Sequence, residues 1–342
     1  MNCVTLGSTG ITVNQNGFGA LPIQRVTKEE AVRLLRMALD GGMTYFDTAR
    51  WYTDSEEKLG LAFKGLRGRL YIATKSGAKT GEQLRRDLET SLSLLQTGYI
   101  DVYQFHNPDF CPRPGDGTGL YEAMLEAKKS GKVRHIGITN HRLNIAEEAV
   151  ESGLYETLQF PFSYLSGEQE LSLIRHCHEK NMGFVAMKAL SGGLISNARA
   201  ACAFMGENPG VLPIWGIQRE KELKEFLSFI KEPPAMDDDL RAVIEHDRSE
   251  LVGDFCRGCG YCMPCPAGIE INNCARMSLM LRRAPSANWL TTEWQEKMAK
   301  IEGCLHCGKC MQHCPYGLHT PDLLAKNLED YKRVLAGEVS VS

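Results

Sequence analysis

Two short segments near the end of the sequence each contain four cysteines. They read CRGCGYCMPCP and CLHCGKCMQHCP, and both end in a Cys-Pro pair. Their cysteines are Cys256, Cys259, Cys262, Cys265, Cys304, Cys307, Cys310 and Cys314. The second segment has the C-x2-C-x2-C-x3-C-P spacing of 4Fe–4S cluster ligands. The first repeats this pattern with one residue fewer before its last cysteine, so we predict two 4Fe–4S clusters.

The last cysteine of such a run, next to the proline, binds the other cluster in two-cluster ferredoxins. We therefore expect crossed ligation. Cys256, Cys259 and Cys262 would bind one cluster with Cys314, and Cys304, Cys307 and Cys310 would bind the other with Cys265. Paired C-x2-C motifs also bind zinc, but two complete four-cysteine runs favour iron–sulfur clusters. His306 and His313 lie among the cysteines and are expected to face solvent or to form hydrogen bonds.

A second set of reactive side chains lies in the first third of the chain. Asp47, Lys75 and His106 each end a strand-like run, and Tyr52 follows the first of these runs. A tyrosine with an ordinary pKa of about 10 is a weak acid, but a neighbouring ammonium stabilises its phenolate. An aspartate would hold that lysine in place, and a histidine could orient a carbonyl oxygen. Singly, such residues are usually structural. Together they predict a site that protonates a carbonyl oxygen, or deprotonates an alcohol.

These residues belong to a regular alternation of strand-like and helix-like segments. The strand candidates are residues 16–21, 44–48, 70–75, 99–106, 133–139, 157–162, 183–188 and 211–217. Between them lie amphipathic segments such as KEEAVRLLRMALDGG, with apolar residues at three- and four-residue steps. Eight such units predict an α/β fold, a (β/α)8 TIM barrel, whose active site lies at the carboxyl ends of the strands. The preceding VTLGSTGITV predicts a small hairpin that turns at Ser8–Gly10.

The segment KEPPAMDDDL, with two prolines and three aspartates, predicts a break between two domains. We place the barrel at residues 1–235 and a small, mainly helical dicluster ferredoxin-like domain at 236–342. Thirteen cysteines in a chain of 342 residues would be unusual as disulfides in the reducing cytosol, which again favours metal ligation.

Charge and composition argue against some classes of function for this sequence: nucleic-acid binding, membrane insertion and secretion. The net charge of −3 gives no indication of a nucleic-acid partner. The sequence contains no run of about 18 apolar residues, so we expect no membrane span. The first residues lack the basic start and apolar run of a secretory signal. We therefore expect a cytoplasmic protein.

The segment GMTYFDTARWY, followed by SEEKLG, resembles the aldo-keto reductase family. ATK and QFHNPD match the family's other two catalytic positions, and the similarity covers residues 1 to about 232. The resemblance implies that Tyr52 is the general acid/base, that Lys75 and Asp47 tune it, and that His106 orients the substrate. The cysteine-rich end is similar to that of an aldo-keto reductase subgroup with a 4Fe–4S ferredoxin-type domain.

The resemblance also implies NAD(P)H as a cofactor. Thr139, Asn140 and Gln159 would hold the carboxamide, and Met187 stands where the family usually has a tyrosine that stacks on nicotinamide. Further positions expected near the nucleotide are Lys188, Gly216, Gln218 and Arg219. Family members that bind NADPH carry an arginine where this chain has Glu222, which would repel a 2′-phosphate, although Arg219 could compensate. The choice between NAD and NADP stays open.

Three functions remain compatible with these two halves. The preferred one is an NAD(P)-dependent oxidoreductase acting on a small carbonyl or alcohol, with clusters that are structural or link it to an electron partner. In the alternative, the barrel binds substrate without nicotinamide chemistry and electrons come from a ferredoxin or flavoprotein. In the third, the barrel is a non-catalytic binding module.

Overall fold

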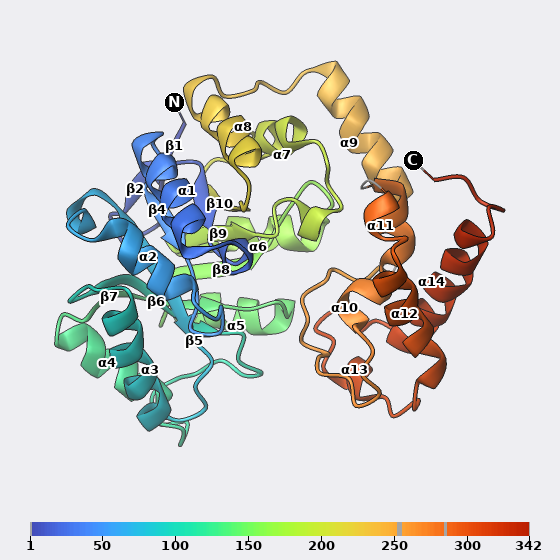
Figure 1. Cartoon of the computed structure of the whole chain (residues 1–342). Coiled ribbons are helices and arrows are strands. Elements are labelled where there is room, and N and C mark those ends of the chain that lie inside the picture. The colour runs from blue at the N-terminus through green and yellow to red at the C-terminus, as the bar shows by residue number, and fades with distance from the viewer. Residues whose placement is uncertain (1, 252–254, 284–285, 342) are drawn as a thin grey trace. The chain divides into compact units, whose positions relative to one another are not determined.

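The computed structural model describes residues 2–251, 255–283 and 286–341 (Figure 1). The chain forms two compact units. The first consists of Met1–Ala189 and Ala198–Arg241, and the second of Leu190–Asn197 and Ala242–Ser342. The C-terminal change from one unit to the other falls within helix α9 (Asp238–Glu250), a few residues beyond the division expected at 235/236. The short segment Leu190–Asn197 leaves the first unit, joins the second and returns.

The first unit is a closed barrel of eight parallel strands in the order β10-β3-β4-β5-β6-β7-β8-β9. The strands are β3 (Gly17–Gly19), β4 (Tyr45–Asp47), β5 (Tyr71–Ser76), β6 (Ile100–His106), β7 (Val133–Thr139), β8 (Thr157–Pro161), β9 (Gly183–Met187) and β10 (Val211–Gly216). Each overlaps one of the eight strand segments expected from the sequence. The predicted (β/α)8 barrel is confirmed.

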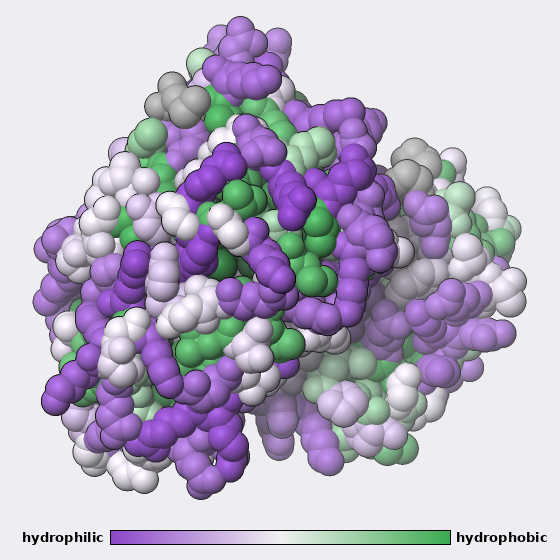
Figure 2. Space-filling view, turned by 60° about the vertical axis from the view of Figure 1, so that its left-hand side comes forward, coloured by the Kyte–Doolittle hydropathy of each residue, from purple (hydrophilic) through white to green (hydrophobic). Residues whose placement is uncertain are grey.

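Helices surround the barrel (Figure 1). They are α1 (Lys28–Asp40), α2 (Ser55–Phe63), α3 (Gly81–Leu94), α4 (Leu120–Lys129), α5 (Leu143–Ser152), α6 (Glu168–Glu179), α7 (Ala198–Gly206) and α8 (Glu220–Lys231). In α1, the Thr27 side chain caps the amino terminus by accepting from the Glu30 N–H, and Leu34 and Leu35 are buried. On the face shown in Figure 2, hydrophilic side chains cover most of the surface and hydrophobic ones form smaller patches between them.

A small hairpin packs against the apolar interior of the barrel. Strands β1 (Cys3–Thr5) and β2 (Thr12–Asn14) pair antiparallel around a turn that contains Ser8–Gly10, as expected. Their buried side chains join one cluster with inward-facing barrel residues. The cluster contains Val4, Leu6, Ile11, Val13, Tyr45, Ala73, Val102, Val185, Met187, Leu212 and Ile214. The part of the barrel next to the hairpin is therefore a packed core, and the carboxyl ends of the strands are the expected place for an active site.

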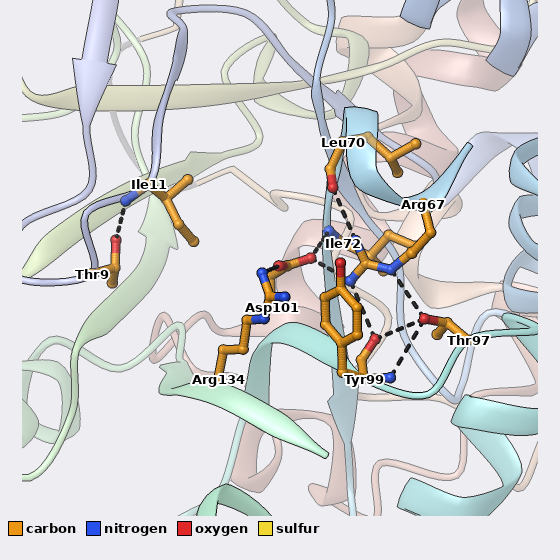
Figure 3. A network of polar contacts seen from close by, with 9 residues as sticks. All are labelled: Thr9, Ile11, Arg67, Leu70, Ile72, Thr97, Tyr99, Asp101 and Arg134. Carbon is orange, nitrogen blue, oxygen red and sulfur yellow. Dashed lines mark hydrogen bonds and ion pairs between the residues drawn. The ribbon is translucent and has the colours of Figure 1, made fainter. Parts of the chain in front are cut away.

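A buried carboxylate anchors the start of strands β5, β6 and β7 (Figure 3). Asp101 accepts hydrogen bonds from the guanidinium groups of Arg67 and Arg134 and, at 2.9 Å, from the backbone N–H of Ile72. The two guanidinium carbons lie 4.0 and 3.8 Å from the centre of the Tyr99 ring. Two cations and a backbone donor offset the cost of burying this charge.

Glu156 provides a test of the electrostatics that stabilise the barrel. Burial alone would raise the pKa of its carboxyl, but bonds from His135 (2.6 Å), Lys128 (2.5 Å) and the Ile136 N–H (3.0 Å) outweigh this and lower the pKa from 4.5 to about 2. A pKa lowered by folding contributes stability above the unfolded value, and this contribution is lost as pH falls from 4.5 to about 2. Glu156→Gln should therefore be less stable than wild type at pH 7, and the difference should shrink across that acid window.

Urea unfolding of both proteins at several pH values measures this difference, because they share every other titrating group. Glu147→Gln, on the exposed side of α5, is the matched control and should differ little from wild type at any pH. A Glu156→Gln deficit that stays constant down to pH 2 would contradict the assignment.

The second unit is mainly helical between its two cysteine segments. Besides the end of α9, its helices are α10 (Ile271–Cys274), α11 (Met277–Arg283), α12 (Thr292–Ala299), α13 (Lys309–Gln312) and α14 (Thr320–Leu335). Among the residues that the structure describes, no helix combines the length and the apolar character needed to cross a bilayer.

Candidate active site and cluster-binding region

Three of the four residues expected to carry acid–base chemistry end adjacent strands. Asp47 is the last residue of β4 and His106 the last of β6, while Lys75 is the next-to-last residue of β5. The strand order β4-β5-β6 makes them neighbours around the barrel. All three are buried, with Lys75 at 0% and Asp47 at 2% exposure. Since parallel strands end at one rim, the fold gathers these side chains at that rim.

Asp47 and Lys75 form a buried ion pair. The Lys75 Nζ lies 2.6 Å from the Asp47 Oδ1 and also donates to the Thr48 carbonyl oxygen at 2.7 Å. Burial raises the pKa of Asp47 and lowers the pKa of Lys75, while each partner's charge opposes the shift of the other. The close contact and the carbonyl acceptor favour the charged forms of both groups and so oppose the effect of burial.

Tyr52 lies beside this pair on the loop between β4 and α2. The Lys75 Nζ is 5.3 Å from the centre of the Tyr52 ring. The Tyr52 and His106 rings meet edge to face with their centres 5.9 Å apart. Tyr52 is half-buried, whereas its three neighbours are buried. The structure thus brings together the four residues predicted from the sequence and leaves the tyrosine accessible.

His106 is electrically neutral in this environment. Burial and then the nearby charge of Lys75 lower the pKa of His106 well below 6.5. Within the described part of the chain, its buried Nδ1 atom has no hydrogen-bond partner. A neutral imidazole can donate one hydrogen bond to a carbonyl oxygen without adding a charge to the site.

Gln104 was not among the predicted site residues. Its side chain connects Asp47 on β4 with Thr139 on β7 and Gln159 on β8. Its amide nitrogen donates to Gln159 Oε1 at 3.0 Å and lies 3.4 Å from Asp47 Oδ2. Its oxygen accepts from the Thr139 hydroxyl at 3.0 Å. Gln104 precedes His106 by two residues on β6, so strand alternation places both side chains on the inner face. That alternation is the signal from which Gln104 could have been found.

The residues expected to hold the carboxamide are buried and make contacts within the protein. Besides its bond with Gln104, Gln159 has its nitrogen 3.4 Å from Asp47 Oδ1. Asn140 donates to the Pro108 carbonyl at 2.8 Å and its Oδ1 accepts from the N–H groups of His141 and Arg142 at 2.9 Å. Hydrogen bonds within the protein therefore hold the side chains of Thr139, Asn140 and Gln159 in place at the predicted rim.

The other expected nucleotide positions follow strands β9 and β10. Met187 is buried in the barrel's apolar cluster, and Lys188 next to it has a positive φ of 58° and is half-buried. Gly216 ends β10. Gln218 and Arg219 precede α8, and their backbone N–H groups both donate to Glu222 Oε2 at 3.0 Å. Glu222 thus caps the amino terminus of α8 with its own negative charge.

Two aromatic side chains complete the rim. The exposed Trp51 ring lies 4.6 Å, centre to centre, from the His106 ring. A Cβ atom at Gly77 would come within 1.7 Å of the Trp51 ring, so only glycine leaves room for it. His141, not predicted as a site residue, is buried, and its pKa is well below 6.5 because of burial and the nearby charges of Lys188 and Arg142. Trp51 and Tyr52 thus both contact the His106 ring.

In the second unit, the cysteines line two cavities. One is lined by Cys262, Cys265, Cys304, Cys307 and Cys310. The other is lined by Cys256, Cys259, Cys262 and Cys314. Each cavity contains three cysteines of one segment and the last cysteine of the other, and Cys262 lines both cavities. This grouping is what crossed ligation requires.

The residues around these cavities suit thiolate-bound clusters. The N–H of Gly258 donates to Cys256 Sγ at 3.4 Å, and such N–H···S bonds are among the features that set cluster potentials. His306 and His313 are exposed, in keeping with the non-ligating roles expected of them. Cys274, a ninth cysteine of this unit, is buried and lines neither cavity.

Comparison with known proteins shows two matches along the chain. Residues 15–208 match the Aldo/keto reductase family, and residues 255–319 match a 4Fe-4S dicluster domain. The L-galactose dehydrogenase of Arabidopsis thaliana is 31% identical over 210 residues, which are 56% of this chain and 66% of that protein. Aldo-keto reductase YhdN of Bacillus subtilis is 30% identical over 215 residues, or 57% of this chain and 64% of that protein. The chain thus spans just under two thirds of the length of these two relatives.

A solved structure shares the barrel. The aldo-keto reductase from Klebsiella pneumoniae in complex with NADPH superimposes with a TM-score of 0.59 at 22% identity, covering 72% of this chain and 94% of that one. At this level of identity the likeness concerns the fold.

Proposed function

The chain belongs to the aldo/keto reductase family, and from that premise we propose that it transfers hydride between a nicotinamide nucleotide and a small carbonyl or alcohol, with Tyr52 as general acid/base. The observation that carries the proposal is the convergence of the Tyr52 ring, the Lys75 ammonium 5.3 Å from its centre and the His106 ring 5.9 Å away. A purely structural cluster of this kind would not need an accessible tyrosine beside a buried ion pair.

Each residue has a defined part in carbonyl reduction. The Tyr52 hydroxyl gives its proton to the carbonyl oxygen as hydride reaches the carbon, and the phenolate that remains is stabilised by the Lys75 ammonium. Asp47 keeps that ammonium charged and directed, and neutral His106 donates a hydrogen bond to the same oxygen. When bound, the nicotinamide nucleotide supplies the hydride. In alcohol oxidation the Tyr52 phenolate takes the proton back.

The proposal is tested by mixing cluster-replete protein, purified without oxygen, with NADH or NADPH and a panel of small aldehydes and ketones. The cluster absorption near 400 nm and the nucleotide absorption are followed together. We expect nucleotide oxidation only when a carbonyl is present. Bleaching of the clusters by nucleotide alone, or no response to either nucleotide, would instead favour electron delivery through a ferredoxin or flavoprotein. The exposed position of Cys307 gives this second function its support, since an exposed cluster edge can exchange single electrons.

For the nucleotide we propose NADH over NADPH, because Glu222 already binds the N–H groups at the start of α8. The Arg219 side chain is 73% exposed and its Nε lies 3.8 Å from Glu222 Oε1, so a phosphate bound by Arg219 would also lie near the Glu222 carboxylate. Glu222→Gln keeps a capping oxygen but removes the negative charge. It should raise the ratio of kcat/KM for NADPH over NADH by roughly tenfold. Glu225→Gln, on the exposed side of α8, should leave the ratio unchanged, and equal ratios in both variants would refute the role of Glu222.

We also propose crossed ligation of two 4Fe–4S clusters by the eight cysteines. If it is correct, Cys314→Ser should perturb the same cluster as Cys256→Ser, and Cys265→Ser the same cluster as Cys304→Ser. Iron and sulfide analysis should show that each variant loses up to about half of its iron and sulfide. Electron paramagnetic resonance of the reduced proteins should group the four variants into these two pairs. Cys274→Ser is the control and should keep both signals. A Cys314→Ser spectrum matching that of Cys304→Ser would contradict crossing.

A further inference from the structure

A buried arginine of the second unit joins two segments that are far apart in sequence. Arg276, between α10 and α11, is 9% exposed. Its Nη1 donates to the Gly192 carbonyl oxygen at 2.8 Å, and its Nη2 lies 3.3 Å from Asn273 Oδ1. A guanidinium is seldom buried unless it makes directed hydrogen bonds, so this contact is a specific feature of the packing.

Two glycines leave room for the guanidinium. Gly192 and Gly258 have φ values of +67° and +64°, a region that side chains rarely adopt. A Cβ atom would lie 2.9 Å from Arg276 Nη1 at Gly192, and 2.7 Å from Arg276 Cζ at Gly258. The Gly192 position would also approach the Arg257 carbonyl oxygen at 3.3 Å. The Arg276 side chain therefore lies directly against both glycine backbones.

These glycines belong to segments with different roles. Gly258 lies between Cys256 and Cys259, and its N–H donates to Cys256 Sγ. Gly192 lies in the turn η3 (Ser191–Gly193) of the segment Leu190–Asn197, which begins two residues after Lys188 and leads into α7. The segment that follows the end of strand β9 is thus part of the compact unit that contains the cysteines.

We propose that Arg276 is a positioning residue that clamps the 190–197 segment to the Cys256–Cys259 loop, so that cluster assembly at this loop orders the chain after β9. The inference rests on the proposed function in one respect: the chain binds a nicotinamide nucleotide, and Lys188, two residues before this segment, is expected near it. A cluster would fix the backbone of the cysteine loop, whereas the same loop without iron would sample many conformations. Because Arg276 contacts both the loop and the 190–197 segment, ordering of the loop also orders the segment. Nucleotide binding then depends on an intact cluster.

Arg276→Met tests the clamp because it keeps much of the side-chain volume but removes the hydrogen bonds. Hydrogen exchange of the cluster-replete protein should become roughly tenfold faster at residues 190–197, with strands β4 to β6 unchanged. NADH, measured by quenching of protein fluorescence, should bind roughly tenfold more weakly, as expected for the loss of one charged hydrogen bond. Arg282→Met is the matched control. Arg282 belongs to the same unit, is 41% exposed in its side chain and pairs with Asp330, so its replacement should leave both measurements unchanged.

A second pair of variants separates the clamp from general destabilisation. Cys259→Ser should speed exchange at 190–197 by itself, and adding Arg276→Met to it should cause little further change, because both act through one element. If Arg276→Met does not accumulate as folded protein, Gly192→Ala replaces it, since its Cβ would displace the same guanidinium. Exchange at 190–197 that does not respond to Arg276→Met, or responds equally to Arg282→Met, overturns the inference. Absence of nucleotide binding by wild type would instead refute the proposed function, and the exchange data would still decide the clamp.

Discussion

Replacing Tyr52 with phenylalanine should lower kcat for carbonyl reduction by about 10²- to 10⁴-fold, the range usually lost with a general acid. The ring would keep its edge contact with His106 and its place near Lys75, so that only the transferable proton is removed. Because the hydroxyl acts in the transition state, kcat and kcat/KM should fall together. The affinity for NADH should stay within about twofold of wild type, since nucleotide binding does not require the proton.

Tyr71→Phe is the matched control for this change. Tyr71 begins β5, at the opposite end of the strand from Lys75, and is half-buried like Tyr52. Its replacement should leave kcat unchanged. Steady-state kinetics and nucleotide titration of the two variants would decide the matter. A Tyr52→Phe enzyme with wild-type turnover would rule out the acid–base assignment and favour a barrel that only binds its ligand.

The barrel and its four reactive residues could be predicted because both depend on local patterns. Each strand is a short apolar run followed by an amphipathic helix, and parallel closure then forces strand ends such as Asp47 and His106 to one rim. The cysteine segments could also be recognised in the sequence, because the spacing of the first three cysteines of each run is typical of the ligands of one cluster. Local regularity is thus sufficient to predict the barrel and to identify the residues for which we propose a chemical role.

The remaining features depend on contacts that no local pattern encodes. Gln104 lies on a predicted strand, but its bonds to Gln159 and Thr139 exist only once the barrel closes. The contact of Arg276 with Gly192 joins residues 84 positions apart, and in the sequence Gly192 is one of many loop glycines. Such tertiary contacts are not visible in the sequence, and the contact with Arg276 connects the 190–197 segment to the second unit.

The second large effect concerns the Asp47–Lys75 pair. Lys75→Met removes the cation from a fully buried site, and the contacts of the Asp47 carboxylate with Gln104 and Gln159 that remain are long, both 3.4 Å. Breaking a buried pair in this way typically costs about 3–5 kcal/mol of stability. By contrast, Lys28→Met, which breaks the exposed pair with Glu57, should cost about 0–1 kcal/mol. Urea unfolding of both variants measures the difference.

A double variant separates the two roles of this pair. Asp47→Asn combined with Lys75→Met has no buried charge at either position, so it should regain much of the stability lost by Lys75→Met alone. It should not regain turnover, because the phenolate of Tyr52 would still lack its neighbouring ammonium. Recovery of stability without activity is the expected result and assigns Lys75 to the chemistry. If the double variant regained turnover as well, Lys75 would be a structural partner of Asp47, and the source of tyrosine activation would have to lie elsewhere at the rim.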